Sequence, residues 1–263
     1  SQPERRWSIG SATNQTDRRG SVGSNGLTAS IQSVMTGAGM RKLKRGMSGS
    51  RKMLLDFDKD SVVDGTSKIT SLDQLCAQAT GLDPILRSKV QGWALHSRGC
   101  FRFVDPVREH EGLGPQFVMW QEVHNDPAQV AMIRWGKLKS VSRAVEKLLR
   151  SYREDVSQLL DVCRQSIVFN SVEDLTKCAE IILADPEVKV VRCKNRLDPG
   201  YNAFTSAGYR DVSLNVRIEN QTSSSLGLDA HVCEVLLLLR AFAEVKNEEG
   251  HMRYRQFRNA RGE

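Results

Sequence analysis

The hydrophobic pattern changes along the chain, and each change predicts a different kind of structure. Residues 1–52 are polar and rich in Ser, Gly and Arg. From 71 to 136, apolar side chains recur mostly at helical spacing. A sharper helical stripe follows, formed by Val141, Ala144, Val145, Leu148, Leu149 and Tyr152. Apolar residues that recur every three or four positions predict an amphipathic helix.

Alternation of apolar and polar positions replaces the helical period after this helix. It predicts strands at 163–169, 188–194, 211–218 and 231–240, with a helix over 171–186 and a final helix after the last strand. This order is typical of an α+β domain in which a small mixed β-sheet packs on helices. We therefore expect three regions: a disordered basic tail (1–52), a mainly helical lead-in (53–134) and a folded domain (135–263).

Positive charge is concentrated in the tail. Residues 1–52 contain ten Lys or Arg and two Asp or Glu, a net charge of +8, so the rest of the chain carries about −1 of the total of +7. A core without a concentrated positive field argues against a nucleic-acid-binding groove. The tail predicts either a docking arm for an acidic protein partner or an anionic surface, or a solvated linker. Its two Arg-Arg-x-Ser motifs, which end at Ser8 and Ser21, resemble phosphorylation sites of basophilic kinases.

Cysteine usage and hydropathy limit the setting of the protein. The six cysteines occur singly and without zinc-ligand spacing, so neither structural zinc nor a disulfide framework is expected. Free cysteines in apolar stretches favour an intracellular, reducing compartment. No run approaches the roughly 18 apolar residues of a transmembrane segment. The chain does not begin with Met, and we expect it to be part of a longer protein.

Two carboxylates stand out in the folded region. Glu234 interrupts an otherwise apolar strand, and Asp161 comes just before the strand at 163–169. Brought together, the two would bind Mg²⁺, which takes one or two protein carboxylates together with substrate phosphates. Alternatively, Glu234 would form a structural ion pair; the candidate partners are Arg192, Arg210 and Arg217. The residues themselves leave both interpretations open.

Polar residues near these acids suggest a cleft. The strand at 211–218 places its apolar residues on one face and turns four polar residues to the other, namely Asp211, Ser213, Asn215 and Arg217. On the helix before Asp161, three cations stand one turn apart: Lys139, Arg143 and Lys147. Like charges at this spacing repel unless an anion joins them, although many basic stripes are simply solvated helix faces.

Four motifs in the same order resemble the RelA/SpoT-like nucleotidyltransferase domains, which synthesise guanosine tetra- and pentaphosphate. The motifs are GKLKSVSRAVEKL (136–148), LLDVCRQSIVF (159–169), GYRDVS (208–213) and CEVLLL (233–238). Their form resembles a divergent, eukaryotic-type branch of the family. The resemblance implies a nucleotidyltransferase-like fold and Mg²⁺-dependent pyrophosphate transfer from ATP to GDP or GTP.

The resemblance also implies roles for individual residues. The implied nucleotide-binding residues are Lys137, Lys139, Lys147, Tyr209 and Arg210, and the implied catalytic and metal-binding residues are Asp161 and Glu234. Among them, Lys139 and Lys147 would hold the ATP phosphates, with Lys137 at a position where Arg is usual. Tyr209 would stack on the guanine of the acceptor nucleotide.

Several positions depart from the family pattern, and they keep a second function open. Arg143, Arg164, Ser166, Ser213 and Leu236 stand where the family has Ser, Gly, Arg, His and Gln, respectively. Phosphoryl transfer depends on positioned charges, and one lost donor commonly costs ~2.7–4 kcal/mol. The domain is therefore either a divergent pyrophosphotransferase, with Arg143, Arg164 or Arg210 as a substitute, or a catalytically inactive homologue that senses nucleotides or binds other proteins.

Overall fold

A computed structural model describes residues 69–105, 110, 114–245, 252 and 256–257 of the chain. The expected disordered tail and its two Arg-Arg-x-Ser motifs lie outside these residues. None of the helices in the described part has both the length and the apolar character of a membrane span.

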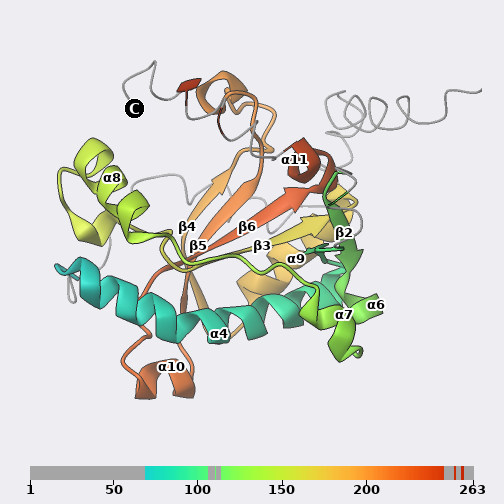
Figure 1. Ribbon diagram of the computed structural model, residues 1–263, viewed down its shortest axis with the longest axis horizontal. Helices are drawn as coiled ribbons and strands as arrows, with labels where there is room; N and C mark the ends of the chain where they lie inside the picture. Colours follow the sequence, from blue (N-terminus) through green and yellow to red (C-terminus); the bar gives the residue numbers. More distant parts are fainter. Residues whose placement is uncertain (1–68, 106–109, 111–113, 246–251, 253–255, 258–263) are drawn as a thin grey trace, which may run out of the picture.

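A six-stranded mixed sheet, in the order β2-β1-β3-β6-β5-β4, forms the centre of the domain (Figure 1). The strands are β1 (Cys100–Phe103), β2 (Gln116–Met119), β3 (Arg164–Phe169), β4 (Val188–Asn195), β5 (Val212–Ile218) and β6 (Cys233–Leu239). The β3–β6 pair is parallel and the other pairs are antiparallel. The last strand along the chain, β6, thus lies between β3 and β5.

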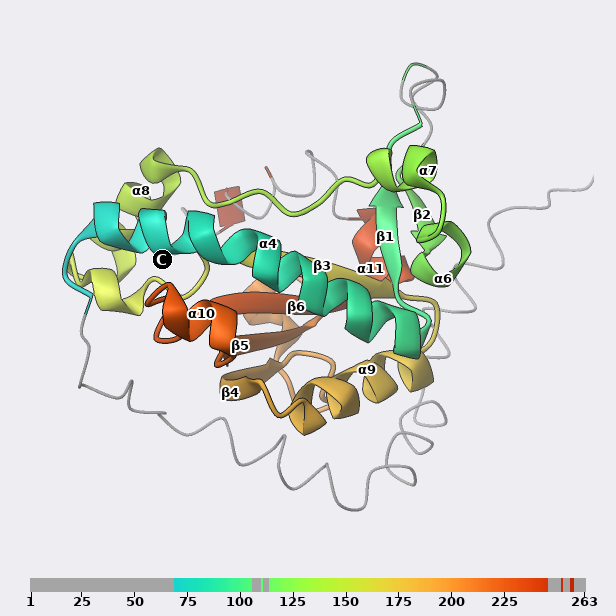
Figure 2. The same cartoon turned by 90° about the horizontal axis from the view of Figure 1, so that it is seen from below.

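Two long helices cover one face of the sheet (Figure 2). The helices of the described chain are α4 (Leu72–Ser97), α6 (Trp120–Val123), α7 (Pro127–Ala131), α8 (Val141–Ser151), α9 (Val172–Ala184), α10 (Gln221–Ser225) and α11 (Arg240–Val245), with short 3-10 turns η2 (Val156–Gln158) and η3 (Ala203–Ser206). Buried apolar residues of α4 and α9 join the inward-facing residues of the strands in one core, in which Leu82, Ile182, Ile167 and Leu214 are fully buried.

Local sequence signals explain where these two helices begin and end. The Ser71 side chain caps α4 by accepting a hydrogen bond from the backbone N–H of Gln74, and Ser171 caps α9 in the same way. Acidic residues in the first turn of each helix complement the helix dipole. After α4 the chain turns at Arg98, which has a left-handed backbone conformation with φ of 57°, and at the next residue, Gly99, a Cβ atom would lie 2.6 Å from Cγ2 of Ile167. Glycine is therefore needed for the close approach of α4 to the sheet.

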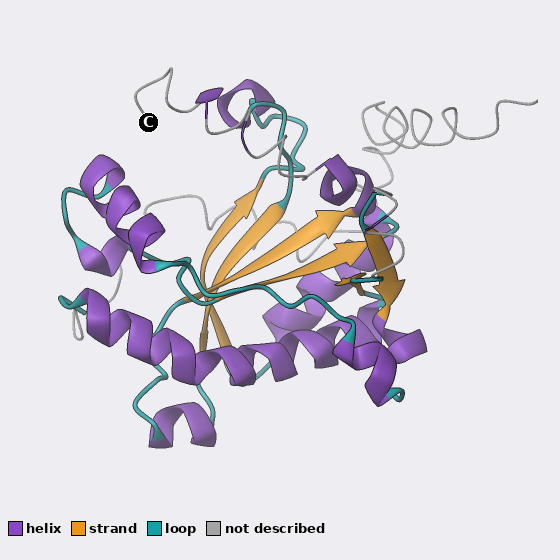
Figure 3. Cartoon of the chain, in the orientation of Figure 1, coloured by secondary structure: helices purple, strands orange, loops and turns teal. Residues whose placement is uncertain are grey.

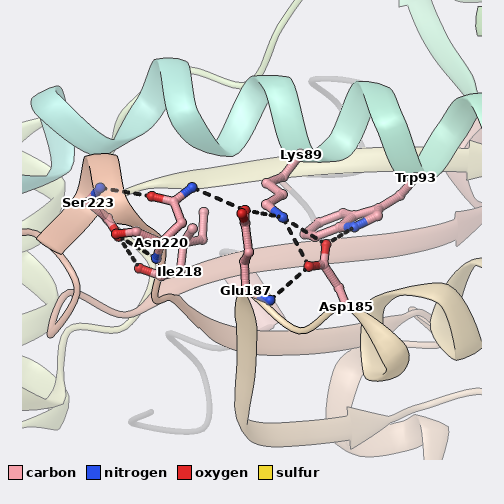
Figure 4. Close-up of polar contacts among 7 residues, drawn as sticks. All are labelled: Lys89, Trp93, Asp185, Glu187, Ile218, Asn220 and Ser223. Atoms are coloured by element: carbon pink, nitrogen blue, oxygen red, sulfur yellow. Dashed lines mark hydrogen bonds and ion pairs between the residues drawn. The ribbon is translucent and has the colours of Figure 1, made fainter.

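A polar network joins α4 to the chain segments around β4 and α10 (Figure 4). Lys89 forms ion pairs with Asp185 at 2.9 Å and Glu187 at 2.8 Å, and the indole N–H of Trp93 donates to Asp185. Glu187 in turn accepts a hydrogen bond from Asn220, the N-cap residue of α10. Because these groups satisfy one another, we assign the network a structural role.

The structure confirms the expected α+β class with a mixed sheet packed on helices. The four strands and the helix expected after residue 160 are present, with ends that differ by one or two residues. Most of the regular structure in the described part of the lead-in is helical, in α4, α6 and α7, but β1 and β2 also lie within it and extend the sheet beyond β3. Each of these strands has only four residues, too few for alternation to be distinguished from helical spacing.

Candidate functional site

Asp161 holds two lysines at the start of β3. Its Oδ2 atom lies 2.6 Å from Nζ of Lys139 and 3.0 Å from Nζ of Lys147. Lys147 comes from α8, whereas Lys139 comes from the long loop that connects α7 to α8 (Figure 3). All three side chains are largely buried, with 14% of Asp161, 11% of Lys139 and 27% of Lys147 exposed. The structure therefore brings together three of the residues that the sequence motifs singled out.

Hydrogen bonds fix the loop that carries Lys139 against β3. The backbone N–H of Lys139 donates to the carbonyl of Val162, and that of Gly136 donates to the buried side chain of Gln165. Gln165 also donates to Asp83 on α4. A Cβ atom on Gly136 would lie 2.5 Å from the carbonyl oxygen of Arg164, so this contact requires glycine. The position of Lys139 is thus determined by β3 and α4 together.

The electrostatics of this cluster keep Asp161 ionised. Burial favours the neutral carboxyl, but the charges of Lys147 and Lys139 outweigh burial and hold the pKa of Asp161 below its usual value. Burial, aided by the charges of Lys147 and Arg164, lowers the pKa of Lys139 despite its contact with Asp161. For Lys147, the charge of Asp161 and the contact with Tyr152 outweigh burial and raise the pKa.

Glu234 lies nearby on β6, and its pKa is shifted in the opposite direction to that of Asp161. Ser213 on β5 donates a hydrogen bond of 3.0 Å to its Oε1 atom. Burial raises the pKa of Glu234, and the neighbouring charge of Asp161 raises it further. No Lys or Arg among the described residues forms an ion pair with Glu234, so the pairings considered with Arg192, Arg210 and Arg217 are not made there. Two neighbouring carboxyl groups whose pKa values move apart are typical of acid–base sites.

Strand register places Glu234 in a row of four side chains that crosses the sheet. Arg164 on β3, Glu234 on β6, Asn215 on β5 and Arg192 on β4 are paired in sequence across this row. A β-bulge between Val190 and Arg192 turns Arg192 to this face while the earlier valines of β4 pack on the core. The next row is Ser166, Leu236, Ser213 and Lys194. The face opposite α4 and α9 therefore combines cations with small polar side chains.

The polar residues of β5, and Asp211 just before it, are mostly covered, in contrast to the open cleft floor that the sequence predicts. Asp211 is 1% exposed, Ser213 4% and Asn215 6%. Asp211 forms an ion pair with Arg196, and the Asn215 side chain donates to the carbonyl of Leu160. On this polar face, Asn215 thus anchors the segment before Asp161, and Ser213 supplies the hydroxyl that contacts Glu234.

Tyr209 and Arg210, both implied to bind nucleotide, have other contacts in this structure. Burial raises the pKa of Tyr209, and the contact of its hydroxyl with Asp211 raises it further. Its partly buried ring packs against the apolar cluster of Cys100, Val168, Leu238 and Ala243, the last of which belongs to α11. Arg210 donates to the carbonyls of Arg196 and Asp198, at 2.9 and 3.1 Å. Both residues therefore brace the loop before β5.

The remaining cations separate into two groups. Lys137 is exposed on the loop before α8, and Arg143 pairs with Glu146 on α8 at 2.7 Å. Arg164, in contrast, lies close enough to act on the pKa values of both Lys139 and Glu234. Arg143, Arg164 and Arg210 were considered as replacements for the donors that the family motifs have and this chain lacks. Of these three, Arg164 is the one that the fold brings near the carboxylates.

The carboxylates fit Mg²⁺ as far as two protein ligands allow. The Oδ1 atom of Asp161 is buried without a hydrogen-bond partner in the described structure. An orphaned carboxylate oxygen beside a second carboxyl group suits a cation that completes its shell with water and phosphate oxygens. No group of three or more His, Cys, Asp or Glu that would form an all-protein metal site occurs among the described residues.

Comparisons with known proteins give similarities in structure only. No family model and no curated protein matches the chain. The small alarmone synthetase 2 from Bacillus subtilis is similar over 71% of this chain and 81% of its own, with 15% identity and a TM-score of 0.43. The small alarmone synthetase 1 from Bacillus subtilis, bound to its product pppGpp, covers 48% of this chain and 68% of its own, with 20% identity and a TM-score of 0.32.

A third similar structure is a type VI effector in complex with its immunity protein. It covers 74% of this chain and 76% of its own, with 15% identity and a TM-score of 0.41. Two of these three structures are alarmone synthetases, the proteins whose motifs this sequence resembles. At these identities and TM-scores the similarity carries no conclusion about what this chain binds or does.

Sequence analysis did not single out Arg192 and Lys194 as site residues. A simple alternation through VKVVRCK would put both on the same face as the core valines. The β-bulge instead places Arg192 and Lys194 on the face of Asn215 and Ser213, and no pattern in the sequence predicts the position of the bulge. The available signal was that Arg192 and Lys194 would both fall on the buried face under this alternation, whereas Lys189 would not.

Proposed function

We propose that the domain transfers a phosphate-containing group from a nucleoside triphosphate to a hydroxyl group of a second nucleotide. The observation that carries this proposal is the pair formed by Asp161 and Glu234. One carboxylate is kept ionised by two lysines, and the pKa of the other is raised by burial and by its neighbour. The motif resemblance supports ATP as the donor, GDP or GTP as the acceptor and pyrophosphate as the transferred group.

The lysines and the arginine would bind the donor. Lys139 and Lys147 share Asp161, so the three side chains together carry a net charge of +1. Arg164 adds a guanidinium group beside them, and such a group binds phosphate oxygens in pairs. These cations would hold the triphosphate and neutralise the charge that develops on it during transfer.

Glu234 is suited to act as the general base. A raised pKa brings a carboxylate closer to the pH at which it both is ionised and accepts a proton readily. In the proposed step the acceptor hydroxyl oxygen attacks the β-phosphorus of ATP, the bond to the α-phosphate oxygen breaks, AMP leaves, and the hydroxyl proton passes to Glu234. The hydrogen bond from Ser213 to Oε1 would orient the carboxylate for this proton transfer.

Asp161 and Glu234 are also the residues that would hold Mg²⁺. A bound Mg²⁺ supplies charge neutralisation and alignment of the phosphate oxygens. The buried Oδ1 atom of Asp161 is the oxygen best suited to this ligation, because Oδ2 already contacts both lysines. Asp161 would thus orient the lysines through one oxygen and the metal through the other.

A second function, nucleotide binding without turnover, is supported by the position of Tyr209. Its ring is partly buried against the domain and its hydroxyl contacts Asp211, so it would stack less readily on the base of an acceptor, while the cations that would hold a donor triphosphate remain. Together with Ser166 in place of an arginine, this arrangement favours a sensor or a protein-interaction module. The assay below distinguishes the two functions.

The test is a turnover assay with labelled nucleotide. The 263-residue chain is incubated with γ-labelled ATP, GDP or GTP, and Mg²⁺, and products are separated by chromatography. We expect labelled product from the wild type and none from Asp161→Asn or Glu234→Gln, while Glu146→Gln, which removes a paired carboxylate elsewhere on α8, keeps activity. Nucleotide binding with no product from the wild type would establish the sensor and refute the transferase.

A further inference from the structure

Helix α8 carries an exposed apolar stripe. Val141, Val145 and Leu149 are 56%, 39% and 62% exposed, and they follow one another at every fourth position. Ala144 and Leu148, on the adjoining side of the same apolar face, are buried in the core. We call the three exposed residues the α8 stripe. Aligned exposed apolar side chains of this size indicate a surface that another element covers.

The surroundings of the α8 stripe are basic. Helix α8 contains Arg143, Lys147 and Arg150 but only one acid, Glu146, for a net charge of +2. Arg143 and Arg150 both pair with Glu146 and remain 38% and 30% exposed. An element that covers this helix should therefore combine apolar side chains with carboxylates.

Such a segment lies in this chain just before the described part. Residues 53–64, MLLDFDKDSVVD, contain four Asp and one Lys, a net charge of −3, among six apolar residues. We call them the acidic segment. Their charge is opposite to that of α8 and also opposite to that of the basic tail at 1–52. In apolar content and in charge, the acidic segment complements the α8 stripe.

The chain geometry lets the acidic segment reach α8. The first described residues, Ile69 and Leu72, pack against the same core cluster as Ala144 and Leu148 of α8. Figures 1 and 2 both show the N-terminal end of α4 at the same end of the molecule as α8. From Phe57 to Ile69 an extended chain spans about 40 Å, whereas α8 is only about 16 Å long. A tether of this length gives a high effective concentration of the segment at the helix.

We propose that the acidic segment docks on the α8 stripe of its own chain. Leu54, Leu55 and Phe57 contact the stripe, and the neighbouring aspartates face the cations of α8. The docked segment covers the helix that supplies Lys147. This proposal concerns an intramolecular interface and does not depend on the proposed transferase activity.

Hydrogen exchange of the full chain tests the interface. In the segment variant Leu54→Ser/Leu55→Ser/Phe57→Ser, the backbone amides of α8 should exchange about tenfold faster than in the wild type, which corresponds to a docking free energy of about 1.4 kcal/mol. The matched control is Ile31→Ser/Val34→Ser/Met35→Ser, which removes three apolar residues from the basic tail. It should leave exchange in α8 unchanged.

Cross-linking identifies the occupant. A zero-length carbodiimide should join an aspartate of the acidic segment to Lys147 or Lys137 within one chain, and Leu149→Ala should reduce the yield of this product. Equal exchange in all variants would overturn the proposal. Cross-links between chains, with protection that rises with protein concentration, would show that a second copy covers the stripe instead. Protection that appears only with anionic phosphatidylserine vesicles would assign the stripe to a membrane surface and would equally overturn it.

Discussion

Replacing Asp161 by Asn should strengthen the binding of ATP in the absence of Mg²⁺ while it abolishes turnover. In the wild type, Asp161 contacts both Lys139 and Lys147, and the three groups have a net charge of +1. The substitution raises this charge to +2 and removes a carboxylate that repels the phosphates of the ligand. The lysines should therefore bind phosphate better, although the residue that would ligate the metal is lost.

The size of the effect follows from the geometry. A phosphate oxygen held by either lysine would lie about 5 Å from Oδ2 of Asp161, because the two Nζ–Oδ2 distances are 2.6 and 3.0 Å. One unit of charge at about 5 Å contributes about 3 kcal/mol at an effective dielectric constant of about 20. Lys147 is 27% exposed, so solvent screening reduces this value. We expect a gain of about 1.4 kcal/mol, or about tenfold in Kd.

Isothermal titration calorimetry with ATP and EDTA measures this change. The matched control is Glu146→Gln, because Glu146 also pairs with two cations of α8 but does not contact Lys139 or Asp161. Glu146→Gln should change the Kd much less, and higher ionic strength should reduce the gain seen for Asp161→Asn. Unchanged or weaker ATP binding by Asp161→Asn would refute the assignment of the two lysines to the phosphates.

Three further predictions concern the base and the loop beside it. The pKa of Glu234 is raised, so its ionised form appears only as the pH rises through that pKa. The kcat/KM of the wild type should therefore increase over this range above pH 4.5, and a flat profile there would contradict the assignment of Glu234 as the base. Because the folded state also binds this proton more tightly than the unfolded state, Glu234→Gln should stabilise the fold at pH 7, and a lower midpoint of thermal unfolding would contradict the assignment. Gly136→Ala should destabilise the domain by about 1–3 kcal/mol in chemical denaturation, since its Cβ would meet the carbonyl of Arg164 at 2.5 Å; wild-type stability would show that the loop shifts freely.

The sequence predicted the elements of the folded region because their periods are long and clear. The strands after residue 160 and the helix between the first two have enough apolar positions to define a face. In β1 and β2 the alternation is too short, and their role in the sheet depends on pairing with residues far along the chain, such as the contact of Cys100 with Val168. Local sequence does not encode such distant partners.

The candidate site was predictable to a similar degree. Motif order pointed to Lys139, Lys147, Asp161 and Glu234, and the fold brings these four side chains close together. The covered position of Tyr209 depends on tertiary packing around α11 and could not be read from the motif. The face of the sheet on which Arg192 lies depends on a β-bulge. A bulge is a local irregularity of backbone pairing, and no clear sequence signal predicts this one.

The central position of β6 has a consequence for the order of synthesis. A ribosome completes β3 and β5 before β6 emerges, yet β6 lies between them in the finished sheet. Until residues 233–239 have been made, the neighbouring edges of β3 and β5 have no strand to pair with and are open to other chains. Glu234 arrives with this same strand, so a nascent chain acquires the second carboxylate in the step that closes its sheet.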